Sequence, residues 1–80
     1  MSLEEIYAKV ENFLVEDMEI DAEKINGDAL LVKDLGIDSL EVVDIVVYVD
    51  DEFGYKMKPE DFKQLHTVND FCNFIKEHMA

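Results

Sequence analysis

The chain of 80 residues carries 20 acidic side chains against 7 lysines and no arginine, which gives it a net charge of -13. This charge would repel the phosphate backbone of a nucleic acid and argues strongly against nucleic-acid binding. Hydrophobic residues make up 49% of the sequence, which excludes a disordered acidic tail. The length predicts one domain over residues 1–80, and the low glycine and proline content favours helices.

The sequence shows no sign of secretion or of a membrane span. Its N-terminal stretch, MSLEEIYAKVENFL, lacks the basic region and the continuous apolar block of a signal peptide. No run approaches the roughly 20 apolar residues that a membrane-spanning helix needs. The single cysteine, Cys72, cannot form an internal disulfide. We therefore expect a cytoplasmic protein, and a monomer.

The first predicted helix covers residues 3–16. Its apolar side chains recur at the helical spacing i, i+3, i+4 and i+7, with charged residues between them. These apolar residues are Leu3, Ile6, Tyr7, Val10, Phe13 and Leu14. Ser2 and Glu5 have the spacing of a capping box, in which each side chain bonds the backbone N–H of the other residue. The helix is therefore predicted to start directly after Ser2.

Residues 17–37 break this rhythm and are predicted to form a long ordered loop. Apolar residues alternate irregularly with acids there, and Gly27 and Gly36 interrupt the pattern. The residues expected to pin the loop to the core are Met18, Ile20, Ile25, Leu30, Leu31, Leu35 and Ile37. A short helical turn is expected near residues 22–25. Loops of this length are uncommon and tend to be functional.

The second long helix is predicted to begin at Asp38 or Ser39 and to end near Phe53. Asp38 and Glu41 have capping-box spacing, which makes Asp38 the expected N-cap and Ser39 the first helical residue. Gly54 supplies a C-terminal stop. The β-branched run VVDIVVYV is also compatible with a strand, but acids interrupt it and its apolar residues recur at helical spacing.

This second helix has two apolar faces when its residues are placed at ~100° intervals around the axis. The face expected toward the core holds Val42, Ile45, Val46, Val49 and Phe53. Leu40, Val43 and Val47 lie on the far side, flanked by the acids Asp44, Asp50 and Asp51. Burying that second face would bring unpaired carboxylates to the edge of the core at considerable cost. We therefore favour a docking surface for basic proteins over a helix buried all round.

Two further helices complete the predicted fold. Pro59, a residue suited to a first helical turn, opens a short third helix over residues 59–65. Thr67 and Asp70 form a capping box for a fourth helix over residues 68–79. Its apolar face consists of Val68, Phe71, Cys72 and Ile75. The prediction is an all-α, small four-helix bundle with three longer helices and one short one.

Ser39 has no base beside it in the sequence, and we expect no enzymatic activity. The two histidines, His66 and His78, are expected at the surface, and Cys72 lies on an apolar helix face where a buried thiol is expected. No metal-binding or phosphate-loop motif occurs, so no metal site is expected. A hydroxyl in the first turn of a helix is, however, accessible to another enzyme, and a phosphate attached there would be stabilised by the helix dipole.

The stretch DLGIDSLEVVDIVVYVDDEF, residues 34–53, resembles the central segment of acyl carrier proteins, whose hallmark is D-S-L after a leucine–glycine pair. The order of the first helix, the long loop, the acidic second helix, PEDF and TVNDFCNFI is also similar, so the resemblance covers nearly the whole chain. It implies that Ser39 is esterified by 4'-phosphopantetheine, which a separate phosphopantetheinyl transferase donates from coenzyme A. The missing base is then explained, because another enzyme performs the chemistry on Ser39.

The resemblance further implies a function and a set of partners. The thiol of the prosthetic group would carry acyl intermediates as thioesters in fatty-acid, lipid or polyketide-type biosynthesis. The partners would be acyl-loading, chain-extending and acyltransferase enzymes with basic docking surfaces. Family members present the positions of Asp38, Leu40, Glu41 and Asp44 to such enzymes. With the outer apolar face added, the expected partner surface is Asp38, Leu40, Glu41, Val43, Asp44, Val47 and Asp51.

The resemblance also implies a cleft in which an acyl chain can shelter. The candidate lining residues are Val46, Phe62, Leu65 and Phe71. The family often has small residues at the positions of Phe62 and Phe71, so we expect a reshaped cleft. Tyr48 stands at another position that is often small, and Lys56 and Lys58 stand where acids are common. These departures predict a specialised carrier.

Two alternatives remain open from the sequence alone. One is an acidic protein-interaction module that carries no prosthetic group. The other is a peptidyl or aminoacyl carrier, which would have the same fold. Peptidyl carriers often have histidine before the serine, so Asp38 favours an acyl carrier.

Overall fold

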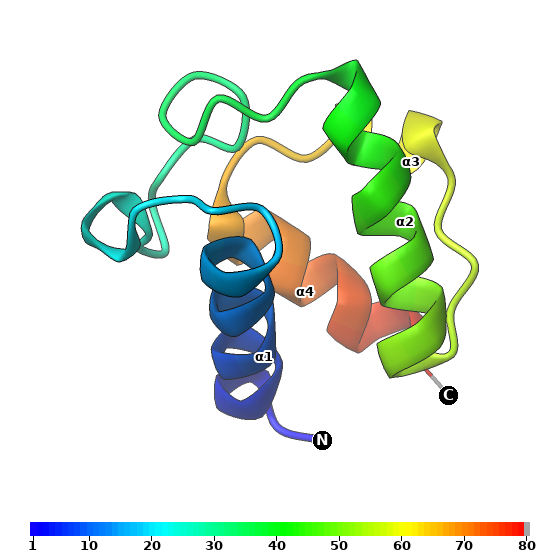
Figure 1. The fold of residues 1–80 in the computed structure, drawn as a ribbon. Coiled ribbons are helices and arrows are strands. Elements are labelled where there is room, and N and C mark those ends of the chain that lie inside the picture. The colour runs from blue at the N-terminus through cyan, green and yellow to red at the C-terminus, as the bar shows by residue number, and fades with distance from the viewer. Residues whose placement is uncertain (80) are drawn as a thin grey trace.

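Helices form nearly all of the regular structure of residues 1–79, which are the residues that the computed structural model describes (Figure 1). The elements in chain order are α1 (Leu3–Glu16), the short 3-10 helix η1 (Ala22–Lys24), α2 (Ser39–Phe53), α3 (Pro59–Lys63) and α4 (Val68–His78). The predicted all-α class and small helical bundle are confirmed. The helical turn expected near residues 22–25 is η1.

The predicted bounds of α1 and α2 agree with the structure, whereas those of α3 and α4 were too long. α3 ends at Lys63 and not at residue 65, because the Gln64 and Leu65 N–H groups bond the carbonyls three residues earlier, at 3.2 and 3.0 Å. Such bonds tighten a final turn into 3-10 geometry. α4 ends at His78, since Met79 has an extended backbone.

The helix starts are set by side-chain caps. The Glu5 N–H donates to Ser2 Oγ at 3.2 Å, and Ser2 N–H donates back to the Glu5 carboxylate at 3.4 Å. Thr67 and Asp70 make the same reciprocal pair at the start of α4. The Asp70 carboxylate accepts N–H bonds from Thr67 and His66, and these bonds lower its pKa. Each predicted capping box that the structure contains satisfies backbone donors that the helix itself leaves free.

The core gathers the inner faces of all four helices. α1 and α4 pack side by side, and α2 lies across from α1 with α3 packed against it (Figure 1). The buried helical residues are Ile6, Val10, Phe13 and Leu14 of α1, Val42, Ile45, Val49 and Phe53 of α2, Phe62 of α3, and Val68, Phe71, Cys72 and Ile75 of α4. Val46, which the helical pattern also placed toward the core, is only partly buried.

The long loop before α2 is held to the connection between α3 and α4 and to the first turn of α4 by backbone hydrogen bonds. Leu31 N–H donates to the His66 carbonyl at 2.8 Å, and Val68 N–H donates to the Ala29 carbonyl at 3.1 Å. Asn69 N–H donates to the Gly27 carbonyl, and a Cβ at Gly27 would meet the Asn69 side chain at 2.5 Å. The predicted anchors Ile25, Leu31, Leu35 and Ile37 are buried, while Met18, Ile20 and Leu30 are partly buried. The loop is therefore ordered, as predicted.

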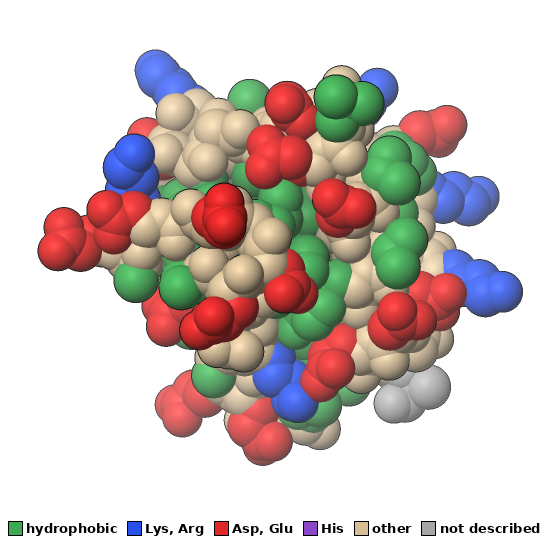
Figure 2. Space-filling view, in the orientation of Figure 1, with side chains coloured by type: hydrophobic (Ala, Val, Ile, Leu, Met, Phe, Trp, Pro, Cys, Tyr) green, Lys and Arg blue, Asp and Glu red, His purple; other side chains and the backbone are tan. Residues whose placement is uncertain are grey.

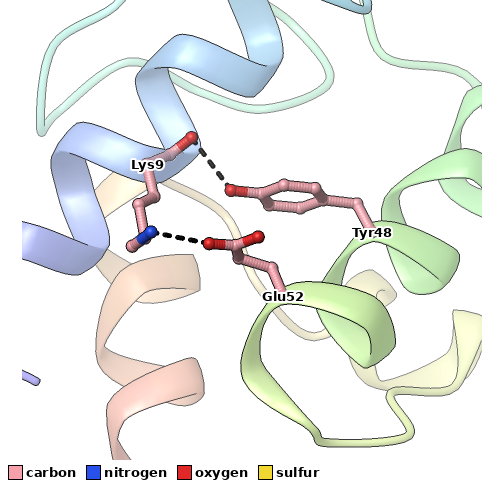
Figure 3. A network of polar contacts seen from close by, with 3 residues as sticks. All are labelled: Lys9, Tyr48 and Glu52. Atoms are coloured by element: carbon pink, nitrogen blue, oxygen red, sulfur yellow. Dashed lines mark hydrogen bonds and ion pairs between the residues drawn. The ribbon is translucent and has the colours of Figure 1, made fainter.

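Tyr48 joins α2 to α1 (Figure 3). Its hydroxyl donates to the Lys9 carbonyl at 3.0 Å, and its ring stacks on Phe13 with the centroids 4.0 Å apart. One turn later, Glu52 pairs with the Lys9 ammonium group at 2.6 Å. Burial, followed by the nearby Glu52 carboxylate, raises the pKa of Tyr48 to about 12. The large side chain at this position therefore serves as a link between helices.

Replacing Tyr48 with phenylalanine tests this link. The variant keeps the stacked ring but leaves the Lys9 carbonyl without the hydroxyl donor, so the free energy of unfolding should fall by about 1 kcal/mol. Urea denaturation measures the change. Tyr55→Phe is the matched control, because the Tyr55 hydroxyl makes no hydrogen bond within residues 1–79. Equal stability of the two variants would contradict a structural role for the Tyr48 hydroxyl.

Candidate functional site

Ser39 is the first residue of α2, and its side chain is exposed. Within the described residues its hydroxyl has no hydrogen-bond partner, and neither histidine bonds to it. Another enzyme can therefore reach the hydroxyl without breaking an existing contact. An attachment site requires this accessibility. A serine that acts as a nucleophile within its own chain would instead have a base within hydrogen-bond distance.

The Ser39 hydroxyl is free because Asp38 caps the helix. Asp38 Oδ1 accepts the N–H groups of Leu40 at 3.0 Å and Glu41 at 2.9 Å. The Glu41 carboxylate accepts the Asp38 N–H at 3.3 Å, which completes the predicted capping box. Two acids thus satisfy the backbone of the first turn, and Ser39 has no structural task there.

The segment that leads into Ser39 is fixed by a tight turn over residues 30–37. Leu35 N–H donates to the Leu30 carbonyl at 3.0 Å, and Ile37 N–H donates to the Leu31 carbonyl at 3.2 Å. Gly36 has a left-handed backbone with φ of 71°, which side-chain-bearing residues rarely adopt. Buried Leu35 and Ile37 on either side of this glycine anchor the turn in the core. The position of Ser39 is therefore set by the loop as well as by the helix.

A pocket of about 410 Å³ opens beside Ser39, between the loop, the start of α2 and the end of α3. Its lining residues are Leu30, Val32, Lys33, Ile37, Asp38, Ser39, Val42, Phe62, Lys63, Leu65 and His66. Its volume lies in the range of roughly 300–1,000 Å³ that is typical of small-molecule sites. An apolar-walled space thus adjoins the free hydroxyl.

Two of the four residues expected in an acyl cleft, Phe62 and Leu65, line this pocket, and Val46 and Phe71 do not. Phe71 packs edge-on against Phe62 with the ring centroids 6.0 Å apart, and only 1% of it is exposed. Phe62 therefore forms the pocket wall and Phe71 supports it. The lining residues Leu30, Val32 and Ile37 could not be predicted from the sequence, because a loop has no periodicity to show which way a side chain faces.

The outer face of α2 carries three exposed apolar side chains with acidic side chains beside them. Leu40 is 80% exposed, Val43 53% and Val47 55%. Figure 2 shows hydrophobic side chains interleaved with acidic ones over the region of α2. Asp44, Asp50 and Asp51 are exposed, and Glu41 is partly buried. The reading in which α2 is buried all round is therefore wrong for this face.

The other groups that were weighed for chemistry have ordinary surroundings. Burial raises the pKa of the Cys72 thiol to about 11, so the thiol stays protonated and unreactive. His78 is exposed and stacks on Phe74 with the centroids 4.1 Å apart. His66 is exposed as predicted, but it also lines the pocket beside Ser39, which the sequence did not reveal. Residues 1–79 contain no group of three or more His, Cys, Asp or Glu side chains that is arranged to hold a metal ion.

Among the same residues, no helix has both the length and the apolar character to cross a membrane. The longest helix, α2, has 15 residues and carries acids along its outer side.

The family described as "Phosphopantetheine attachment site" matches residues 8–75, and the chain belongs to this family. The relatives include the acyl carrier protein of Thermotoga maritima, which is 36% identical over 79 residues, 99% of this chain and 98% of its own length. The acyl carrier protein of Bdellovibrio bacteriovorus is 33% identical over 90% of this chain and 92% of its own length. That of Lactobacillus acidophilus is 31% identical over the full length of both chains.

The chain is thus a non-catalytic acyl carrier whose prosthetic group is covalently attached 4'-phosphopantetheine. The residues present fit that group, since the structure provides a free hydroxyl at a helix start with an apolar pocket beside it. The family assignment does not favour the alternative of an interaction module without a prosthetic group.

The role of Asp38 as the N-cap of α2 can be tested by comparing its removal with the removal of an acid near the C-terminus of the helix. Asp38→Ala should lower the free energy of unfolding by about 1 kcal/mol, because two first-turn N–H groups lose their acceptor. Asp50→Ala removes the same charge near the C-terminus of the helix, where an acid opposes the dipole, and should leave stability unchanged or raise it slightly. Thermal and urea unfolding compare the two. Equal effects would show that general charge repulsion, and not capping, governs this site.

Proposed function

We propose that Ser39 is the attachment point of 4'-phosphopantetheine and that the protein carries acyl intermediates on it between biosynthetic enzymes. The observation that carries the proposal is the exposed, unbonded Ser39 hydroxyl, which stands free because Asp38 caps the helix in its place. The chain has one other serine, Ser2, and its hydroxyl is engaged in the cap of α1.

The transfer joins Ser39 Oγ to a phosphorus atom of coenzyme A and displaces the adenosine-containing part, while the proton of the hydroxyl leaves to a base of the transferase. This chain supplies the nucleophilic oxygen and its location at the helix start. The α2 dipole favours a negatively charged phosphodiester at that end of the helix. Once bound, the group supplies a thiol on which acyl chains are held as thioesters.

The outer face of α2 is the docking surface in this proposal. Exposed Leu40, Val43 and Val47 form an apolar strip that an enzyme can cover. Asp44 and Asp51 border that strip and also line a hollow of about 380 Å³ with Val47 and Tyr48. A lysine or arginine of a partner enzyme fits a hollow with this chemistry, and opposite charges would speed the encounter. Asp38 and Glu41 belong to the surface but serve first as caps.

The expected partners are a phosphopantetheinyl transferase and the acyl-loading, chain-extending and acyltransferase enzymes of fatty-acid, lipid or polyketide-type biosynthesis in the cytoplasm. Phe62 supports the proposal of a specialised carrier, because this large side chain forms a wall of the pocket beside Ser39. The ring narrows a space that a small residue would leave open.

Attachment is tested by intact mass. Incubation with coenzyme A and a promiscuous transferase should add one phosphopantetheine group to the wild type and none to Ser39→Ala. Ser2→Ala is the matched control and should be modified like the wild type, because its only loss is a cap of α1. An unmodified wild type, or a modified Ser39→Ala variant, would overturn the proposal.

Docking is tested by reversing charge on α2 away from the cap. Asp44→Lys combined with Asp51→Lys should lower the kcat/KM of the transferase about tenfold or more, since two attractive contacts become repulsive. The helical far-UV signal should be unchanged, because both side chains are exposed and make no hydrogen bond within the described residues. Glu23→Lys with Glu77→Lys makes the same change in net charge outside α2 and should have a small effect. Equal losses in both double variants would place the docking surface elsewhere.

A further inference from the structure

The pocket beside Ser39 has a basic rim in a strongly acidic protein. Of the 7 lysines in the chain, Lys33 and Lys63 line this pocket, together with the imidazole of His66. All three side chains are exposed. The ion pair found within residues 1–79 joins Lys9 and Glu52, so neither pocket lysine forms an ion pair with a carboxylate of these residues. Their positive charge is available to a ligand.

The pocket lining holds one acidic side chain, Asp38, against two lysines. Asp38 Oδ1 is already bound to two backbone N–H groups at the positive end of α2. The remaining lining is apolar and comes from Leu30, Val32, Ile37, Val42, Phe62 and Leu65. The pocket therefore combines apolar walls, which suit methylene groups, with cationic side chains, which suit an anion.

We infer that this pocket accepts an acyl chain that has several methylene groups and ends in a carboxylate, so that the cargo of this carrier is a medium-chain dicarboxylic acyl group. The inference rests on the proposed attachment at Ser39, because the arm bound there delivers the chain to the adjoining pocket. The methylene groups lie against the apolar walls, and the terminal carboxylate pairs with Lys33 and Lys63, with His66 as a further donor.

The phosphodiester of the arm is a second anion that could use these lysines. It carries a single negative charge, and the two methyl groups that follow it in the arm are too few to cover the apolar walls to which Phe62 and Leu65 belong. A chain with a carboxylate at its end uses both halves of the pocket. The dicarboxylic cargo therefore accounts for more of the lining than the phosphodiester does.

The test compares two acyl groups of equal length on the full chain. Transfer from hexanoyl- and adipoyl-coenzyme A loads a neutral and a carboxylate-ended chain, and hydroxylamine cleavage measures the lifetime of each thioester. Each lifetime is divided by that of the same acyl group on free pantetheine. In the wild type the adipoyl group should be protected about fivefold more than the hexanoyl group, which corresponds to one partly exposed charge pair.

Two double variants show whether the pocket lysines cause the difference. Lys33→Gln with Lys63→Gln should abolish the preference for adipoyl while retaining the protection of hexanoyl. Lys24→Gln with Lys56→Gln removes two exposed lysines that do not line the pocket, and should keep the preference. Circular dichroism checks that both variants keep their helices.

The outcomes separate the inference from the proposed function. If both groups load and are equally protected, the dicarboxylic cargo is wrong, and the carrier function stands. The same holds if the lysine variant shifts the phosphorus resonance of the arm but leaves the two acyl lifetimes alike, because the lysines then bind the phosphodiester. If neither group loads onto Ser39, both the proposed function and the inference that rests on it are wrong.

Discussion

The capping box at the start of α2 is the interaction on which the functional site depends. The Asp38 carboxylate accepts two N–H groups of the first turn, and Glu41 returns a bond to the Asp38 backbone. The helix therefore begins at Ser39, and the serine has no structural role. Were Ser39 itself the N-cap, its hydroxyl would be turned onto the helix end and engaged there. One pair of acids thus sets the start of the helix and the chemical availability of its first residue.

A second constraint gives Ser39 its surroundings. The backbone bonds from Leu31 to His66 and from Val68 to Ala29 tie the long loop to the connection between α3 and α4 and to the start of α4. With this tie in place, the loop residue Ile37 and the α3 residue Phe62 both line one pocket beside the serine. The inner side of α2 is buried in the core, whereas its outer side is exposed. Attachment, shelter for the acyl chain and docking therefore use mostly different side chains around α2, and Asp38 is shared between the cap, the pocket lining and the docking surface.

The sequence predicts what depends on local interactions and fails where distant segments meet. Capping spacing and helical periodicity gave the bounds of α1 and α2, the free Ser39 and the exposed Val43, because each depends on residues within one or two turns. The lining of the pocket depends instead on long-range backbone bonds, so Leu30 and the basic rim could not be foreseen. Periodicity also places Phe71 on an inner face without showing that Phe62 stands between it and the pocket.

The central claim is that a single serine, made available by its neighbour, carries the prosthetic group. The chain has two serines, both at helix starts, and they differ in whether the hydroxyl is engaged in a cap. The most direct test is to digest the modified protein and to locate the phosphopantetheine group by tandem mass spectrometry. The account predicts the group on the peptide that contains Ser39 and none on the peptide that contains Ser2. A group on Ser2 or on any other residue would contradict it.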